Sequence, residues 1–231
     1  MQTVYWFSQR LADVASGSAW LSADERVKEA SFRFPKRRAD WRLGRWTAKH
    51  ALSRLHTGRA APACGEGLAL AEVRPTPSGA PEAFWDGERL AWSLSISHSA
   101  DRAIVAVAKA ATALGCDIEQ VEPRSAAFID DYFTSFERRA FTAARSHEVL
   151  STLYWSAKES VLKALGEGLR LPLVGLTVES ADAAVAGTGW GTFRVLEERE
   201  RRRFFGFWRR EHGSILTIAS ARASGAPVAL S

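Results

Sequence analysis

Cysteine and long apolar runs are scarce in this chain of 231 residues. The two cysteines, Cys64 and Cys116, lie far apart, so they offer neither a disulfide framework nor the spacing of a zinc site. No run of about 18 apolar residues occurs, so we expect no transmembrane helix. The first residues lack the basic lead and the unbroken apolar stretch of a secretory signal. We therefore expect a cytoplasmic protein that does not enter a membrane.

Acidic residues are fewer than basic ones: 26 Asp and Glu stand against 31 Lys and Arg, for a net charge of +5. The hydrophobic fraction is 46% and the charged fraction 25%, which is ordinary for a folded protein and excludes a disordered or fibrous chain. At roughly 150 residues per domain, the length predicts one large domain or two small ones. The mild positive charge suits phosphate groups or an acidic partner.

The basic residues gather in one segment, 33–54, in which Asp40 is the only acidic residue. A solvated surface usually mixes both signs, so this segment is a candidate for binding phosphate. A second group of arginines, at 199–203, is mixed with glutamates and is predicted to be a solvated strand end or helix face. The basic residues of the first segment are Arg33, Lys36, Arg37, Arg38, Arg42, Arg45, Lys49 and Arg54.

Helical spacing of apolar residues and helix-end signals predict helices over 22–31, 37–56 and most of 128–166. Ser22 and Glu25 have the spacing of a capping box at the first of these. Pro35 breaks or restarts that helix, and Gly166 and Gly168 end the last one.

Strands are predicted over 68–73, 93–97, 103–108, 114–121 and in several pieces of 173–220. The pair Asp86-Gly87 predicts a hairpin turn between two short strands. Residues 58–67 and 75–81 have the composition of a loop and a turn. Helices and strands occur in both halves, so the sequence predicts a mixed α/β (α+β) fold with two subdomains, 1–110 and 111–231.

Two carboxylates, Asp117 and Glu119, are two residues apart on the strand predicted over 114–121. They therefore point to the same face, and Cys116 and Ile118 point to the other. Like charges so close repel each other unless a cation or solvent relieves them. The residues alone leave two interpretations open, an exposed strand face and a cation site.

The last predicted helix has an apolar stripe that packs on the core and a second flank with charged side chains. The simplest interpretation of that flank is a surface Glu–Lys pair, which contributes little to stability. The alternative is that its glutamate joins the two strand carboxylates around Mg²⁺, a cation that prefers oxygen ligands, with lysines reaching toward phosphates. The flank carries Trp155, Glu159 and Lys163, with Lys158 beside them.

In order and spacing, three motifs resemble those of the 4′-phosphopantetheinyl transferases of the surfactin-synthetase-activating type. SISHS begins at Ser95, GCDIE at Gly115 and WSAKESVLK at Trp155. The resemblance covers residues from about 30 to 180 and extends to three further segments. These are DWRLGRWTAK (40–49), YFTSFE (132–137) and GEGLRLPL (166–173).

The resemblance implies an enzyme that moves the phosphopantetheine arm of coenzyme A onto a serine of an apo acyl or peptidyl carrier protein. The by-product is adenosine 3′,5′-bisphosphate. It also implies a monomer built as a pseudo-symmetric pair of similar α/β subdomains, with the active site in the cleft between them. The N-terminal subdomain, 1–110, would hold the 3′-phosphate side of coenzyme A, and 111–231 the metal and the catalytic helix.

The same resemblance implies roles for individual residues. Asp117, Glu119 and Glu159 would hold Mg²⁺, or Mn²⁺ in its place, against the pyrophosphate of coenzyme A, with Lys158 and Lys163 on the phosphates. His98, beside Ser97, would contact the phosphate or ribose, and Arg45, Lys49 and either Arg37 or Arg38 would meet the 3′-phosphate and adenine. Glu159 is the candidate base for the serine proton, with a bound water or hydroxide as the alternative.

One turn departs from the family pattern. Gly79-Ala80-Pro81 stands where the family usually has Gly-Lys-Pro, so a lysine contact to phosphate is missing. Two alternatives follow: Arg74, Arg89 or the basic segment 33–54 replaces it, or coenzyme A binds more weakly. We expect the carrier to dock on 124–137, where Arg124, Arg138 and Arg139 would suit an acidic recognition helix.

Two rival functions follow from the residues. The first is a carrier- or nucleotide-binding module without catalysis, against which the three carboxylates count. The second is a nucleic-acid binder, supported by the basic segment and nine tryptophans. No zinc spacing, basic zipper or RNA-recognition signature accompanies them, so we expect no nucleic acid as partner.

Overall fold

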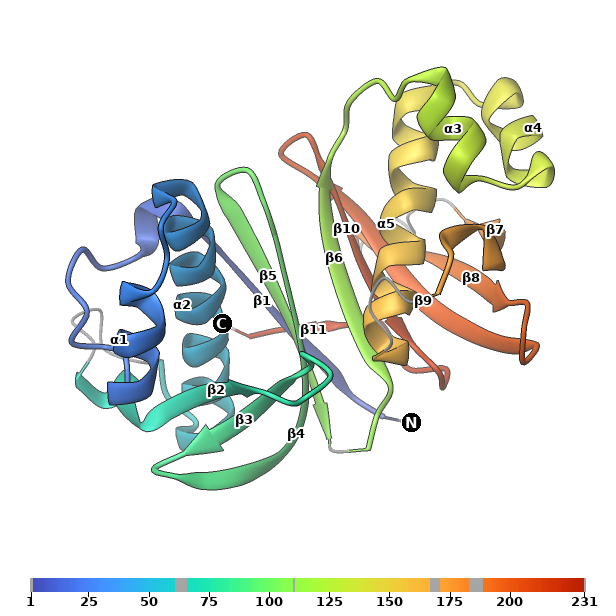
Figure 1. Cartoon of the computed structure of the whole chain (residues 1–231). Helices are drawn as coiled ribbons and strands as arrows, with labels where there is room; N and C mark the ends of the chain where they lie inside the picture. The colour runs from blue at the N-terminus through green and yellow to red at the C-terminus, as the bar shows by residue number, and fades with distance from the viewer. Residues whose placement is uncertain (1, 61–65, 110, 167–170, 183–188, 231) are drawn as a thin grey trace.

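Two β-sheets organise the chain (Figure 1). The computed structural model describes residues 2–60, 66–109, 111–166, 171–182 and 189–230. In spatial order, the first sheet consists of β11 (Val228–Ala229), β1 (Val4–Arg10), β5 (Arg102–Lys109), β4 (Glu88–Ser99), β3 (Pro81–Trp85) and β2 (Ala71–Pro75). The second consists of β6 (Leu114–Gln120), β10 (Ser214–Ser220), β9 (Arg202–Glu211), β8 (Gly191–Glu197) and β7 (Leu176–Ala181).

The strand order is the same in both sheets once β11 is set aside. The first strand of each half lies beside the last, and the order then runs back along the chain to the second strand. In each half the α-helices are inserted between the first and second strands. They are α1 (Ala23–Ala30) and α2 (Pro35–Thr57) in the first half, and α3 (Ala126–Tyr132), α4 (Ser135–Ala143) and α5 (His147–Leu165) in the second. The predicted mixture of helices and strands is confirmed.

Strand β11 crosses the subdomain boundary that the sequence predicts near residue 110. It runs parallel to β1, with Val228 opposite Tyr5, and the backbone N–H of Leu230 donates to the carbonyl of Trp6 at 2.9 Å. The other described strands before and after that boundary belong to different sheets.

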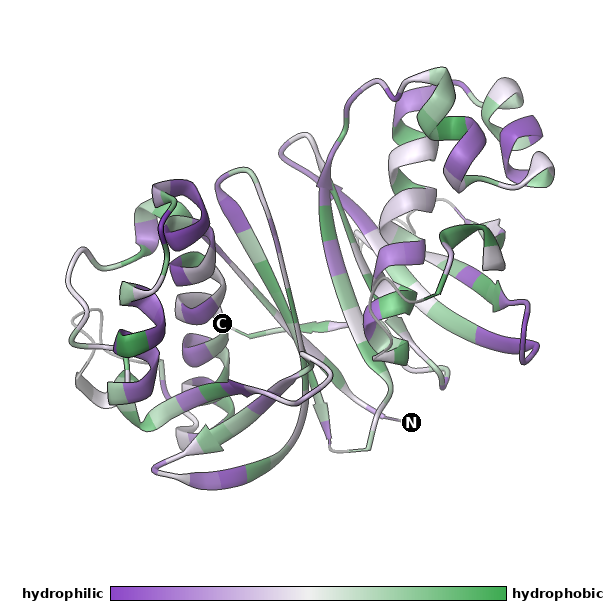
Figure 2. Ribbon diagram, viewed as in Figure 1, coloured by the Kyte–Doolittle hydropathy of each residue, from purple (hydrophilic) through white to green (hydrophobic). Residues whose placement is uncertain are grey.

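The two sheets pack against each other, and α2 and α5 cover their outer faces (Figure 1). Strand β5 is buried on both sides: Val105 and Val107 pack in the cluster that contains α2, whereas Ile104 packs with Cys116 and Ile118 of β6. This explains why its sequence is continuously apolar rather than alternating. Figure 2 shows hydrophobic residues along β5 and β6, where the sheets face each other.

The predicted helix signals hold in the first half. The Glu25 N–H donates to the Ser22 hydroxyl, and the Ser22 N–H donates to the Glu25 carboxylate, which completes the capping box of α1. Pro35 occupies the first turn of α2, where its missing N–H costs no hydrogen bond. The helix ends at Gly58, whose φ of 69° is a left-handed conformation that suits glycine.

The stretch 128–166 is mostly helical, as predicted, and its helical residues belong to three helices, α3, α4 and α5. Thr134 and Ser146 accept hydrogen bonds from backbone N–H groups at the starts of α4 and α5, so each begins a new helix. Gly166 ends α5 as predicted, with a φ of 70°. Gly168 lies outside the described residues.

Most strand predictions are confirmed, and two differ. Asp86 and Gly87, with φ of 48° and 81°, form the hairpin turn between β3 and β4. The strand predicted over 68–73 begins later, at Ala71, because a short 3₁₀ helix (Glu66–Leu70) precedes it. Strand β1 was not predicted. In the described part of the chain, no helix is both long and apolar enough to cross a membrane.

The second basic cluster lies at the turn between β8 and β9, where residues 198–203 are exposed. Arg202 pairs with Glu197 and Glu200, and Arg203 pairs with Glu179. The predicted solvated strand end is confirmed.

Candidate active site

Strand β6 presents two carboxylates to helix α5, as its alternation predicts. Asp117 and Glu119 lie on the face toward α5, while Cys116 is fully buried in the core between the sheets. Helix and strand come unusually close at Gly115, where a Cβ would lie only 1.8 Å from the carbonyl oxygen of Ser160. The absence of a side chain at this position allows α5 to lie directly against β6, next to the carboxylates.

Replacing Gly115 by alanine should destabilise the protein. The added Cβ meets backbone atoms of Ser160 and Ala164, which cannot turn aside as a flexible side chain could. Overpacking of this kind costs about 1–3 kcal/mol of unfolding free energy, which denaturant unfolding would measure. Gly225→Ala is the control, since a Cβ there meets nothing within 4 Å. Equal unfolding midpoints for the two variants would contradict the packing argument.

The predicted flank of α5 lies alongside these carboxylates. Trp155 donates from Nε1 to Glu119 Oε1 at 2.9 Å, and Lys163 donates from Nζ to Asp117 Oδ1 at 2.8 Å. Glu159 lies between them on the helix, half-buried and close enough for both acidic side chains to affect its titration. The structure thus brings together Asp117, Glu119, Glu159 and Lys163.

The electrostatics of this group are dominated by mutual repulsion and burial. Burial raises the pKa of Glu159 to about 7, and the charge of Asp117 adds to the effect. Burial, and then Asp117, also raise the pKa of Glu119. Burial works against the charge of Lys163, but attraction to Asp117 prevails and its pKa is raised. Asp117 Oδ2 is buried and has no hydrogen-bond partner among the described residues, so one carboxylate oxygen of the site is left unsatisfied.

Arg124 also belongs to this site, which the sequence did not indicate. We predicted it on a docking surface, but only 13% of its side chain is exposed and its Nη2 lies 3.6 Å from Glu119 Oε2. Its guanidinium lies 4.9 Å from the ring centre of Phe128 and 5.9 Å from that of Trp155. Arg124 and Trp155 together hold Glu119. The four-residue spacing from Glu159 pointed to Trp155, and no signal in the sequence pointed to Arg124.

The first half of the chain contributes Ser97 to the same site. Its hydroxyl donates to Asp117 Oδ1 at 2.8 Å and accepts a hydrogen bond from Lys163 Nζ at 2.7 Å. His98, the next residue on β4, points to the other face, toward Gly44 on α2. Burial lowers the pKa of His98, and Asp40 on the same helix opposes that shift. Ser97 and His98 therefore lie on opposite faces of β4, with Ser97 toward Asp117 and Lys163 and His98 toward α2, as strand alternation requires.

A cavity of about 520 Å³ lies between the two halves, beside Lys163. The turn 76–82 and strand β4 form one wall, and the start of β6 and the last turn of α5 form the other. Ala80, which stands where the resembled family has a lysine, is on the first wall, and so is Arg89. A volume of this size is typical of small-molecule sites.

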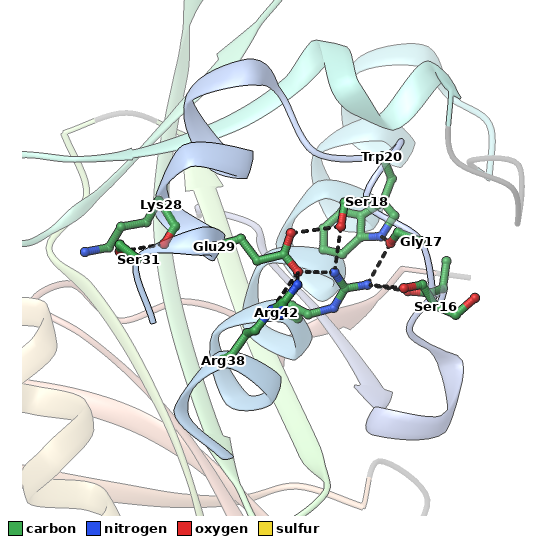
Figure 3. Close-up of polar contacts among 10 residues, drawn as sticks. Ser16, Gly17, Ser18, Trp20, Lys28, Glu29, Ser31, Arg38 and Arg42 are labelled. Carbon is green, nitrogen blue, oxygen red and sulfur yellow. Dashed lines mark hydrogen bonds and ion pairs between the residues drawn. The ribbon is translucent and has the colours of Figure 1, made fainter. Parts of the chain in front are cut away.

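Much of the basic segment 33–54 is turned toward acidic partners (Figure 3). Glu29 accepts hydrogen bonds from Arg38, Arg42 and Ser18. Arg42 also donates to the backbone carbonyls of residues 15–17, which holds the preceding loop on α2. The sequence missed this pairing because the acidic partner lies on α1, outside the segment. The segment's exposed side chains include Arg33, Arg37 and Lys36, and Lys36 pairs with Asp40.

Lys49 and Lys158, for which we predicted phosphate contacts, point into the protein instead. Each ammonium group is fully buried and pairs with a capping-box glutamate, Lys49 with Glu25 and Lys158 with Glu137. Burial lowers the pKa of both lysines, and the glutamates oppose that shift. Arg45 is neither fully buried nor freely exposed: 16% of its side chain is exposed, and its Nε is 3.9 Å from Glu25 Oε1.

The contacts of these two buried pairs are the same in each half. The second oxygen of Glu25 accepts the backbone N–H of Val73 on β2, and that of Glu137 accepts the N–H of Val178 on β7. Each pair therefore joins a short helix, the long helix and the second strand of its own sheet.

No group of three or more His, Cys, Asp or Glu side chains is arranged to enclose a metal ion within the described ranges. Asp117 Oδ1 faces Lys163, and Glu119 faces Trp155 and Arg124. The chemistry of the donors nevertheless suits a hard divalent cation, because they are carboxylate oxygens and no described residue hydrogen-bonds to Asp117 Oδ2.

Comparison with known proteins finds a family whose model matches part of the chain. No curated protein matches the chain. Residues 113–222 match the family model of the 4′-phosphopantetheinyl transferase superfamily. The matched range contains β6 and α5, and with them Asp117, Glu119, Glu159 and Lys163. The match supports the 4′-phosphopantetheinyl transferase superfamily for this chain, and with it a transferase that moves phosphopantetheine.

Proposed function

We propose that this chain transfers the 4′-phosphopantetheine group of coenzyme A to a serine of an apo acyl or peptidyl carrier protein and releases adenosine 3′,5′-bisphosphate. The observation that carries this proposal is the gathering of Asp117, Glu119, Glu159 and Lys163 beside a cavity between the two halves. All four residues lie in the range that matches the superfamily.

The proposal includes the surfactin-synthetase-activating type, a monomer with two similar α/β subdomains related by pseudo-symmetry. The equal strand order of the two sheets supports it. So do the repeated pairs Lys49–Glu25 and Lys158–Glu137, each with its backbone contact to the second strand.

Asp117, Glu119 and Glu159 would hold Mg²⁺, or Mn²⁺ in its place. The unpartnered Oδ2 of Asp117 and the raised pKa values of both glutamates support this role, because each would be relieved by a cation. When bound, the ion supplies positive charge against the pyrophosphate of coenzyme A.

In the transfer, the serine oxygen forms a bond to phosphorus, the bond from phosphorus to the departing adenosine bisphosphate breaks, and the serine proton must be removed. Glu159 is the proposed base for that proton, with a bound water or hydroxide as the alternative, because a carboxylate that also holds a cation is a weaker base. Lys163 binds a phosphate from the cavity edge, and Ser97 holds Lys163 and Asp117 in position.

Contacts to the nucleotide part fall to residues of the first half. Arg38 is about half exposed beside Glu29, and His98 faces the start of α2. For the carrier, helix α4 offers the exposed Arg139 and Phe136, while Arg138 pairs with Asp130 of α3. An exposed arginine beside an exposed aromatic ring suits an acidic recognition helix.

The test of this function is the intact mass of an apo carrier protein after incubation with the chain, coenzyme A and Mg²⁺. We expect a gain of one phosphopantetheinyl group, its loss with EDTA and its return with excess Mg²⁺. Glu119→Ala should abolish the gain, whereas Glu198→Ala, on the exposed turn after β8, should leave it unchanged. No gain with any acyl or peptidyl carrier would contradict the proposal.

A further inference from the structure

Arg124 joins a glutamate of the candidate site to a glutamate of the surface. Its Nη2 lies 3.6 Å from Glu119 Oε2, and its Nη1 lies 3.1 Å from Glu122 Oε1. The Glu122 side chain is 55% exposed, whereas that of Glu119 is 25% exposed and lies against α5. The guanidinium therefore has two carboxylates within reach, and only one of them belongs to the site.

Aromatic contacts and ion pairs keep the Arg124 guanidinium in place. It lies over the rings of Phe128 on α3 and Trp155 on α5. Its Nε and Nη2 are buried, and neither has a hydrogen-bond partner among the described residues. The 3.6 Å between Nη2 and Glu119 Oε2 is an ion-pair distance, too long for a good hydrogen bond. Moving Nη2 away from Glu119 would therefore break no hydrogen bond.

The oxygen of Glu119 that faces Arg124 is also the one more open to a divalent cation. Oε1 accepts the indole N–H of Trp155 at 2.9 Å, whereas the contact of Oε2 is the longer ion pair with Arg124. Two cations that share one carboxylate oxygen repel each other, and the repulsion is strong where burial excludes water. Arg124 therefore opposes a divalent cation at Glu119, and Glu122 is the carboxylate on which the guanidinium can remain when it leaves Glu119.

We propose that Arg124 competes with the divalent cation for Glu119, and that Glu122 retains the guanidinium when the cation is bound. Arg124 is thus a positioning residue that acts on the cation through Glu119, and it sets the concentration of cation that the protein needs. This inference rests on the proposed function for the cation site itself. It gives Arg124 a role inside the site, in place of the carrier contact that the sequence predicted.

Calorimetric titration of the full chain with Mn²⁺, without coenzyme A or carrier, tests the competition. In Arg124→Gln, the Kd for Mn²⁺ should fall about 10-fold, since the partners of a ligating carboxylate commonly change metal affinity by this order. Loss of a merely structural contact would raise the Kd instead. Glu122→Gln should also raise the Kd, because the guanidinium then has only Glu119. Arg203→Gln, which removes one charge from the exposed pair with Glu179, is the matched control and should leave the Kd unchanged.

A double variant separates the competition from a general effect of charge. In the Arg124→Gln background, Glu122→Gln should no longer raise the Kd, because no guanidinium remains to be exchanged. Three outcomes would overturn the inference: an equal effect of Glu122→Gln in both backgrounds, weaker Mn²⁺ binding in Arg124→Gln, and no Mn²⁺ binding by either the wild type or Arg124→Gln. Thermal unfolding shows whether each variant is folded. Because Glu122 is exposed, Glu122→Gln still tests the inference if Arg124→Gln does not fold.

Transfer to a carrier, measured on the same samples, separates this inference from the proposed function. If carriers are modified but the Kd values for Mn²⁺ do not change in the expected directions, the competition fails and the function stands. If no carrier is modified but the Kd values change as expected, the function fails and Arg124 keeps its role.

Discussion

Replacing Glu159 by glutamine should reduce kcat for phosphopantetheine transfer by about 10²- to 10⁴-fold, the usual contribution of a general base. The same variant should fold at least as well as the wild type. Glu159 lies near two other carboxylates, and burial together with Asp117 raises its pKa to about 7. A neutral amide of equal size removes that repulsion and keeps the packing. Rates of adenosine 3′,5′-bisphosphate release and thermal unfolding of the same samples would measure both effects.

The control for this variant is Glu148→Gln, in the first turn of the same helix and about three turns away from Glu159. It should leave the rate of transfer within a few-fold of the wild type. If Glu159→Gln also kept its rate, the serine proton would have to be removed by another group, and Glu159 would lose both its proposed roles.

Replacing Lys158 by methionine should cost about 3–5 kcal/mol of unfolding free energy, because it leaves the buried carboxylate of Glu137 without its cation. In a protein of this size such a loss lowers Tm by roughly 6–20 °C. Lys49→Met should have a comparable effect in the first half, since Lys49 has the same kind of partner in Glu25. Differential scanning calorimetry would measure both variants.

Two further variants test whether the lost stability comes from the unpaired carboxylate of Glu137. Lys158→Met combined with Glu137→Gln should recover part of the lost stability, because no charge then remains buried without a partner. Lys163→Met should lose transfer. It should lower the Tm less than Lys158→Met does, because 30% of the Lys163 side chain is exposed at the cavity and water can reach the carboxylate of Asp117 once the lysine is gone. An unchanged Tm in Lys158→Met would show that the Glu137 pair contributes no stability.

Local signals in the sequence predicted most of the fold, and tertiary pairing decided the rest. The capping box at Ser22 and the turn at Asp86-Gly87 depend on neighbouring residues, so they could be identified from the sequence alone. Strand β1 could not, because its place in the sheet depends on pairing with β5, about a hundred residues later in the chain. The division of 128–166 at Thr134 was also missed, although a capping box with Glu137 marked it.

In the candidate site, too, some features were predictable from local spacing and others depend on tertiary contacts. Alternation along β6 predicted that Asp117 and Glu119 share one face, and the four-residue steps along α5 predicted the same of Glu159 and Lys163, since both depend only on spacing. The family resemblance implied that the two pairs meet. Spacing could not tell a lysine that faces the cavity from one that faces the core. Lys158 is only one residue from Glu159, yet its direction is decided by Glu137 on another helix.

The parallel pairing of β11 with β1 has a consequence for the order in which the protein forms during synthesis. Strand β1 is synthesised before every other described strand, and β11 after all of them. Until β11 arrives, the edge of β1 that does not face β5 has no strand partner, and an open edge of this kind can pair with other chains. The first sheet is therefore completed only after the strands of the second sheet have been synthesised. Until then, the first sheet lacks its edge strand β11.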